Sequence, residues 1–423
     1  MNWIIYFLFV SVSMANLTIG GEVYVAELAA FIALSAILMK GIKDNSIKRL
    51  VYIDIIILVY AFFSLTSVAS GAEHLWESAR YYRANILTPT LIYFAFRFLP
   101  VTPKLFKRGL YFMLPMIVIQ CLLLIKSFVL IGGRQQFFEG HLSYTITLAA
   151  LFVVGASVVW FLRKEDKSTF KTILTFGLMV IIITALYLTF SRTSLGGFLM
   201  LAPIATYVWK RPALVRLSGT AVISGLMLFL VLLFTSSVVY KGSDIDIAEQ
   251  RELQNSSDRL FNVNLFIQDI TGRFKMWGGL TERAMENPIL GGGGASYSTA
   301  KRGHHIASSH NILISVLLVA GIPGILLFIV IIMATYKCFN VISKRSGLMN
   351  DLGKLLWVSY TALIMVAITG GLSGGRLFLF YALMGMIARL SVEKSNFGEN
   401  DTDEVVNTKV VNENVSTRMT RLR

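Results

Sequence analysis

The residues of this chain best suited to chemistry are three arginines and one histidine, each next to an apolar stretch or on an amphipathic one. Arg192, Arg273, Arg376 and His310 lie far apart in the sequence, so folding would have to bring them together. A guanidinium stays charged and can hold a phosphate through two parallel hydrogen bonds. An ordinary imidazole is largely neutral at pH 7 and can accept a proton from a hydroxyl. These three arginines and the histidine predict a site that binds a membrane-borne phosphate and activates a hydroxyl.

Four further residues support this site or compete for the same role. Arg80 and Arg83 are alternative phosphate ligands on the same predicted side of the membrane. Ser191 lies in a tight turn, and Asn311 opens an apolar stretch, where we expect it to fix the helix start or orient a ligand. The simpler interpretation of each arginine is a side chain that reaches to lipid head groups or lies on a polar helix face.

Metal-binding patterns are weak in this sequence. His304 and His305 are adjacent, so both cannot easily face one ion, and no cysteine or carboxylate flanks them closely. Asp244 and Asp246 resemble the D-x-D pair of metal-dependent sugar transferases, but they fall in a charged stretch without helical periodicity. We interpret that pair as solvated surface and expect neither a metal nor a cofactor.

Composition places these residues in a membrane protein. The chain has 423 residues, of which 55% are hydrophobic and 15% charged, and its mean hydropathy is +0.67. A soluble domain of this size could not bury so much apolar surface, and apolar runs of about 17–25 residues can cross a bilayer as helices. The net charge of +15 indicates basic cytoplasmic loops and a basic tail rather than a nucleic-acid partner. The predicted fold class is an all-α polytopic membrane protein.

Twelve apolar stretches are predicted to cross the membrane. Basic loops alternate with less basic ones along the chain, which assigns the basic loops and both termini to the cytoplasm and the arginines above to the outer side. Cys121 falls mid-span and Cys338 at an inner helix end, so no disulfide is expected. The predicted spans are 3–19, 22–42, 49–70, 84–100, 108–132, 142–163, 170–190, 193–210, 214–239, 311–337, 353–371 and 375–391.

The sizeable region between spans is residues 240–310. Between Asp258 and Glu286 its apolar residues recur at helical spacing, which predicts one or two amphipathic helices along the outer membrane surface. Asn287 and Pro288 should end this helical stretch. Residues 291–294 are four glycines, which we interpret as a hinge under a lid rather than a phosphate loop, because the G-K-[ST] ending is missing.

These observations divide the chain into four parts. Residues 1–239 carry transmembrane helices one to nine, and residues 240–310 form the outer loop or lid. Residues 311–391 carry the last three helices. Residues 392–423 are rich in Asn, Asp, Glu and Thr, which is typical of a disordered tail.

Five short motifs between about residues 180 and 335 now identify a family. Their order and spacing resemble the O-antigen ligase and O-antigen polymerase superfamily of bacterial envelope glycan enzymes. The predicted topology, with one large late outer loop, extends this likeness over most of the chain. The motifs are SRTS at 191–194, GRFKMW at 272–277, NPILG at 287–291, SHN at 309–311 and GIPG at 321–324.

The resemblance implies a GT-C-like fold and a metal-independent glycosyltransferase of the bacterial inner membrane, with a periplasmic active site. The donor would be a glycan on undecaprenyl diphosphate. The acceptor would be a sugar hydroxyl of lipid A–core or of a growing glycan, next to the membrane lipids. The family pattern assigns diphosphate binding to Arg192 and Arg273 and the role of catalytic base to His310. Arg376, with Arg80 and Arg83, would add further diphosphate ligands.

Two alternatives stay open. The nearest is a polymerase that extends O-antigen or exopolysaccharide, although Pro203 and Ala284 stand where that branch is described with a glycine eleven residues after each motif arginine. A transporter or flippase is the weaker alternative. It would predict inverted repeats and ionisable residues at the bilayer midplane, and the sequence has no repeat between its halves.

Overall fold

The computed structural model describes most of the predicted helical regions. Within the described residues the chain is helical, apart from one two-stranded hairpin and short turns, in keeping with the predicted helical membrane fold. The described residues are 2–14, 17–19, 23–43, 50–70, 75–100, 102–131, 151–159, 161, 168–189, 197–199, 201, 204, 208, 222–228, 230, 263–292, 311–370 and 375–393.

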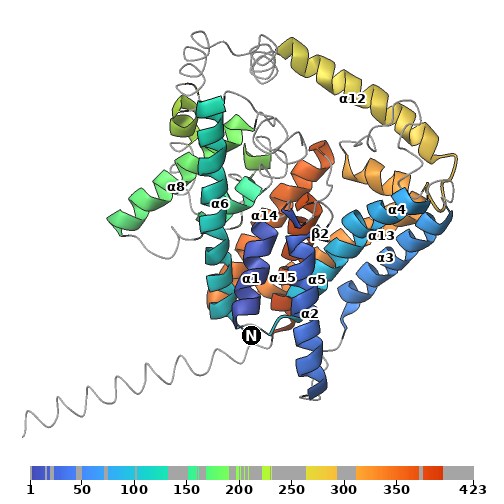
Figure 1. Cartoon of the computed structure of the whole chain (residues 1–423), viewed down its shortest axis with the longest axis horizontal. Helices are drawn as coiled ribbons and strands as arrows, with labels where there is room; N and C mark the ends of the chain where they lie inside the picture. The colour runs from blue at the N-terminus through green and yellow to red at the C-terminus, as the bar shows by residue number, and fades with distance from the viewer. Residues whose placement is uncertain are drawn as a thin grey trace, which may run out of the picture.

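The elements follow the predicted order. Apart from the hairpin strands β1 (Thr18–Ile19) and β2 (Val23–Tyr24), they are helices: α1 Asn2–Ser13, α2 Val25–Lys43, α3 Tyr52–Ser70, α4 Leu75–Tyr82, the π-helix η2 Arg83–Leu87, α5 Thr88–Phe98, α6 Pro103–Ile131, α8 Thr169–Leu188, α12 Val263–Ala284, α13 Ile312–Ser343, α14 Gly347–Gly370 and α15 Gly375–Val392. Figure 1 shows α12 lying across one end of the molecule, whereas α2 extends toward the opposite end.

Six helices in the described part of the chain are long and apolar enough to cross a membrane, namely α2, α3, α6, α8, α13 and α14. The helices α1 and α15 are apolar but shorter. The predicted spans 142–163, 193–210 and 214–239 are described only in part, and their described residues are helical. The chain is thus a polytopic helical membrane protein, and the total of twelve spans stays a prediction.

The first predicted span, 3–19, is wrong in its second half. Helix α1 ends at Ser13, and β1 then pairs antiparallel with β2, with Thr18 opposite Tyr24 and Ile19 opposite Val23. Three of these four residues are β-branched and the fourth is aromatic, which favours extended backbone. At 1.5 Å per residue α1 is about 18 Å long, shorter than the roughly 30 Å of a bilayer core.

The predicted loop 71–83 is also wrong from residue 75 onward. Helices α4, η2 and α5 follow one another without a break, so Arg80 and Arg83 lie on a helical segment. The amide of Thr88 bonds to the carbonyl of Arg83, five residues back, which is the π-helical spacing. Pro89 follows directly and lacks an N–H, so the regular hydrogen-bond ladder cannot continue through it. Local π-turns of this kind are frequent at functional sites.

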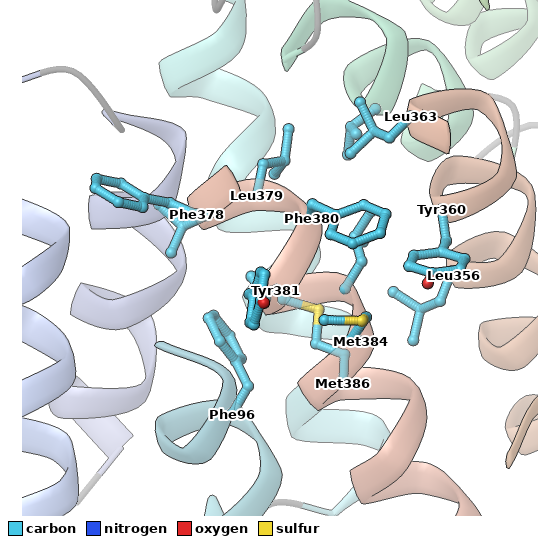
Figure 2. Close-up of a cluster of buried hydrophobic side chains, with 14 of the residues drawn as sticks. Phe96, Leu356, Tyr360, Leu363, Phe378, Leu379, Phe380, Tyr381, Met384 and Met386 are labelled. Atoms are coloured by element: carbon cyan, nitrogen blue, oxygen red, sulfur yellow. The ribbon is translucent and has the colours of Figure 1, made fainter. Parts of the chain in front are cut away.

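The core is built around the close packing of α5 and α15. A Cβ added to Gly385 of α15 would overlap the carbonyl oxygen of Tyr93 and lie 3.1 Å from Cβ of Phe96. A glycine at this position therefore lets the two helices approach closely, as small residues do in membrane bundles. Figure 2 shows Phe380 of α15 facing Tyr360 of α14, and the two rings stack with centroids 4.8 Å apart.

A buried ion pair joins α3 to α5. Asp54 and Arg97 are 0% and 1% exposed, and Asp54 Oδ1 lies 3.1 Å from Arg97 Nε. The same oxygen accepts a hydrogen bond from the Tyr93 hydroxyl at 2.6 Å, and Oδ2 accepts one from the Val51 amide at 2.9 Å. Arg97 falls within the predicted span 84–100, and its side chain is enclosed between the helices.

Neighbouring arginines close the same end of the bundle. Arg389 donates from Nε to the carbonyl of Leu99 at 2.7 Å and pairs with Glu393 one turn later. Arg345 donates to the carbonyls of Leu390 and Ser391, both at 2.8 Å. These bonds satisfy carbonyls at the end of α15 and just after α5. They bring together three basic segments that the predicted topology assigns to one side of the membrane.

Helix α13 is broken at Gly321. Its 32 residues would measure about 48 Å as a straight helix, longer than the bilayer core. Gly321 has φ 63° and ψ −165°, outside the helical region, and Pro323 follows. Residues 322–343 are long enough to span by themselves, at about 33 Å. The first nine residues, 312–320, therefore form a separate helical arm next to the outer loop.

Candidate functional site

Helix α12 is the amphipathic helix that the sequence predicted within the outer loop. It runs from Val263 to Ala284, inside the expected limits. Phe274 is 62% exposed and lies with its ring centroid 5.3 Å from that of Trp277. Ala284 is buried with Leu317 and Leu318 of α13, and Leu280 packs against this cluster. A helix with an exposed aromatic ring and a packed apolar seam suits the membrane interface.

The chain after α12 docks onto the break in α13. The turn 285–290 follows the helix, as Asn287 and Pro288 predicted, and the amide of Gly292 donates to the carbonyl of Leu318 at 2.8 Å. The amide of Ile322 donates to the carbonyl of Pro288 at 2.8 Å. Gly291 and Gly292 are buried. The expected hinge is therefore wrong for these two glycines, which are fixed to α13, while residues 293 and 294 lie outside the described residues.

Asn311 caps the arm of α13. Its backbone is extended, and its side-chain oxygen accepts hydrogen bonds from the amides of Leu313 at 2.9 Å and Ile314 at 3.3 Å. The expectation that Asn311 fixes the start of this helix is confirmed. The predicted base His310 is the preceding residue, and it lies outside the described residues, as do Ser191 and Arg192.

Arg273 lies on α12, eleven residues before Ala284, or about 16 Å along the helix axis. Its side chain is half-buried and already engaged with other groups. Because Ala284 packs on α13 six residues after the Asn311 cap, the helix that carries Arg273 and the arm that begins beside His310 are joined directly. The structure thus brings together the two elements, although it does not describe the histidine side chain.

Arg80 and Arg83 lie on the α4–η2 segment. Arg80 is exposed, whereas Arg83 is half-buried and its Nε lies 3.5 Å from Oε1 of Glu27. Glu27 sits in the first turn of α2, where a carboxylate is favoured by the helix dipole. Sequence reasoning missed Glu27. A single acidic residue at the start of an otherwise apolar span was the available signal.

Tyr24 links this pair to α15. Its ring centroid lies 4.8 Å from that of Phe378, two residues after Arg376 in the first turns of α15. Burial raises the pKa of Tyr24; the charge of Arg83 opposes this shift and that of Glu27 adds to it. The backbone of Arg376 is described, but its side chain is not. The helices that carry Arg83 and Arg376 therefore converge around Tyr24.

The described part of the chain does not hold three His, Cys, Asp or Glu side chains in a group that could bind a metal ion. The predicted weak patterns at His304, His305, Asp244 and Asp246 lie outside the described residues. Cys121 and Cys338 are both free thiols, as expected from their predicted depths.

Comparison with known proteins gives one family match. Residues 177–329 match the family model described as O-antigen ligase. No curated protein and no solved structure matched the chain. The matched stretch contains five predicted site residues, namely Ser191, Arg192, Arg273, His310 and Asn311. It leaves out Arg80, Arg83 and Arg376.

Proposed function

Because residues 177–329 belong to the O-antigen ligase superfamily, we propose that this membrane protein is a glycosyltransferase acting at the periplasmic face of the bacterial inner membrane. It moves a glycan from undecaprenyl diphosphate to a sugar hydroxyl of lipid A–core, a step of lipopolysaccharide assembly. The reaction needs neither a metal ion nor a cofactor. Both termini lie in the cytoplasm.

The observation that carries this proposal is the coincidence of the family match with the α12–α13 contact. The matched stretch holds the predicted ligands Arg192 and Arg273 and the predicted base His310. Within it, α12 packs through Ala284 on the arm of α13 that Asn311 caps. This packing supports a site in which a cation on α12 and a base at the start of α13 share one substrate.

The departure of the diphosphate from the donor requires its negative charge to be neutralised. The bond from the anomeric carbon to the diphosphate oxygen breaks, and the leaving diphosphate takes the electron pair and gains negative charge. Guanidinium groups of Arg192 and Arg273 neutralise that charge and hold the diphosphate in place. Arginine suits the partly dehydrated membrane–water interface because it stays charged and binds two oxygens at once. Arg376, Arg80 and Arg83 are secondary candidates, since they lie outside the matched stretch.

The acceptor side needs a base. His310 takes the proton of the acceptor hydroxyl while that oxygen forms the new bond to the anomeric carbon. Attack opposite the leaving group inverts the anomeric configuration. The N-terminal end of the arm after Asn311 carries partial positive charge, which favours an anionic group nearby. Holding both substrates in line supplies the remaining rate enhancement.

Transfer by the purified protein tests the proposal. The protein is reconstituted with lipid-linked glycan and lipid A–core in the presence of a chelator, and the product is followed by gel mobility. We expect transfer with the parent protein and none with His310→Ala at an equal protein level. Arg108→Ala, an exposed change on α6, is the matched control. Near-normal transfer by His310→Ala would remove the base assignment, and dependence on a metal would remove the metal-independent mechanism.

A polymerase is the second candidate, because it shares the donor and the chemistry and differs in the acceptor. The family description as O-antigen ligase favours the ligase. A deletion strain separates the two. Loss of a ligase leaves long lipid-linked chains without capped lipopolysaccharide, whereas loss of a polymerase leaves single repeat units.

A further inference from the structure

The turn after α12 occupies the position of a missing hydrogen bond in α13. In an unbroken helix the amide of residue 322 would bond to the carbonyl of residue 318. Here the amide of Ile322 bonds instead to the carbonyl of Pro288, and the carbonyl of Leu318 accepts from the amide of Gly292. Both halves of one broken helical bond are therefore satisfied by the same turn.

This replacement matters because of where the break lies. Leu318 is buried, and the break falls within an apolar helix. Water is scarce in such surroundings, so a backbone amide or carbonyl that loses its partner has no substitute. Withdrawing the turn would leave the carbonyl of Leu318 and the amide of Ile322 without their hydrogen-bond partners. The break in α13 and the docked turn thus stabilise each other.

Two glycines make the insertion possible. A Cβ on Gly291 would lie 2.7 Å from the backbone nitrogens of Ala320 and Gly321, and a Cβ on Gly321 would lie 2.5 Å from the carbonyl oxygen of Pro288. Both glycines have positive φ, 69° and 63°. The neighbours are backbone atoms, which cannot rotate away as a side chain can. Any larger residue must therefore push the turn and α13 apart.

An apolar seam continues the contact along both helices. Ala284 of α12 is buried with Leu317 and Leu318 of α13, and Leu280 and Ile314 pack at its edge. The contact thus extends from the turn through one further helical turn of α12. This seam and the inserted turn fix both the position and the direction of α12 on the arm.

We propose that the inserted turn makes α12 and the arm 312–320 one rigid unit. In this unit α12 stays in contact with the arm throughout the catalytic cycle. In this arrangement Gly291 and Gly321 are positioning residues, because they set the place of Arg273 on α12 relative to Asn311 at the start of the arm. The part concerning catalysis rests on the proposed function. Substrates then enter without any swing of α12, in contrast to a mobile lid.

Cysteine cross-linking tests the unit directly. Cysteines replace Leu280 and Ile314 in a full-length background with Cys121→Ala and Cys338→Ala, and a bifunctional thiol reagent joins them. The variants Gly291→Ala and Gly321→Ala are compared with Gly347→Ala. Gly347 is the matched control because it has φ 62° but nothing within 4 Å of an added Cβ. It carries the same backbone strain without the docked neighbour.

We expect the parent and Gly347→Ala to cross-link equally and the other two variants to lose the cross-link. The same two variants should lose kcat/KM for transfer, by about 100-fold if Arg273 is displaced by an ångström or more. The cross-linked parent should keep its transfer rate. Equal cross-linking in all variants, or an inactive cross-linked parent that recovers when the link is cleaved, overturns the proposal.

Amide exchange in the unmodified protein provides a test that needs no variant. The amides of Gly292 and Ile322 should exchange slowly, both alone and with lipid-linked glycan present. Fast exchange at either amide overturns the rigid unit. Cross-linking and exchange do not depend on transfer. If they behave as expected while the parent transfers no glycan, the proposed function fails and the rigid unit stands.

Discussion

Replacing Arg97 with methionine should destabilise the bundle by leaving a buried carboxylate without its cation. Asp54 is fully buried and receives three hydrogen bonds, from Arg97, Tyr93 and the amide of Val51. Methionine removes the charge and one of these bonds but keeps an unbranched side chain, which is shorter than that of arginine. Breaking a buried ion pair on one side costs about 3–5 kcal/mol. Because two donors to Asp54 remain, we expect a loss near the lower limit, about 3 kcal/mol.

A double-mutant cycle separates this charge effect from lost packing. Asp54→Leu alone leaves the Arg97 guanidinium buried, and it should also cost about 3–5 kcal/mol. The double variant removes both charges, so its loss should be smaller than the sum of the single losses by more than about 1 kcal/mol. Arg108→Met on α6 is the control, because Arg108 is exposed and its loss should stay within about 0.5 kcal/mol.

The assay is equilibrium unfolding in mixed detergent micelles, followed by tryptophan fluorescence. The reasoning is refuted if Arg97→Met costs no more than Arg108→Met, or if the single losses simply add. Additive losses would mean that the two groups, although 3.1 Å apart, do not stabilise each other. The pair would then be an ordinary packing contact.

Three other predictions concern packing, capping and metal dependence. Gly385→Val should lower the unfolding free energy by about 1–3 kcal/mol, measured in the same micelles, because the new side chain overlaps the Tyr93 backbone of α5. Asn311→Ala should lower the thermal midpoint through loss of the cap, worth about 0.5–2 kcal/mol, and Asn311→Asp should restore it; equal midpoints for the two would argue against capping. Transfer should proceed at an unchanged rate in EDTA, and a rate that recovers only on adding a divalent cation would contradict the proposed mechanism.

Local patterns account for what could be predicted. Helical periodicity between 258 and 286 predicted α12. The pattern of an amphipathic helix is visible in the sequence because its apolar residues recur three or four positions apart. Asn311 was expected at a helix start for the same reason, since a cap bonds to amides two or three residues on. Errors occurred where local signals compete. Residues 14–19 look apolar enough for a span, yet β-branched side chains there favour the hairpin.

The sequence by itself predicted the helical membrane class of this protein and the likeness of residues 177–329 to the O-antigen ligase family, because apolar run length and short motifs are properties of neighbouring residues. The tertiary structure alone decided three pairings: Arg97 with Asp54, Arg83 with Glu27, and the turn at Pro288–Gly292 with the break at Gly321. The partners lie between about 30 and 56 residues apart in the chain. A charge or a glycine looks the same in sequence whether it faces lipid, water or another helix. Only packing brings its partner to it and excludes the water that would otherwise replace that partner.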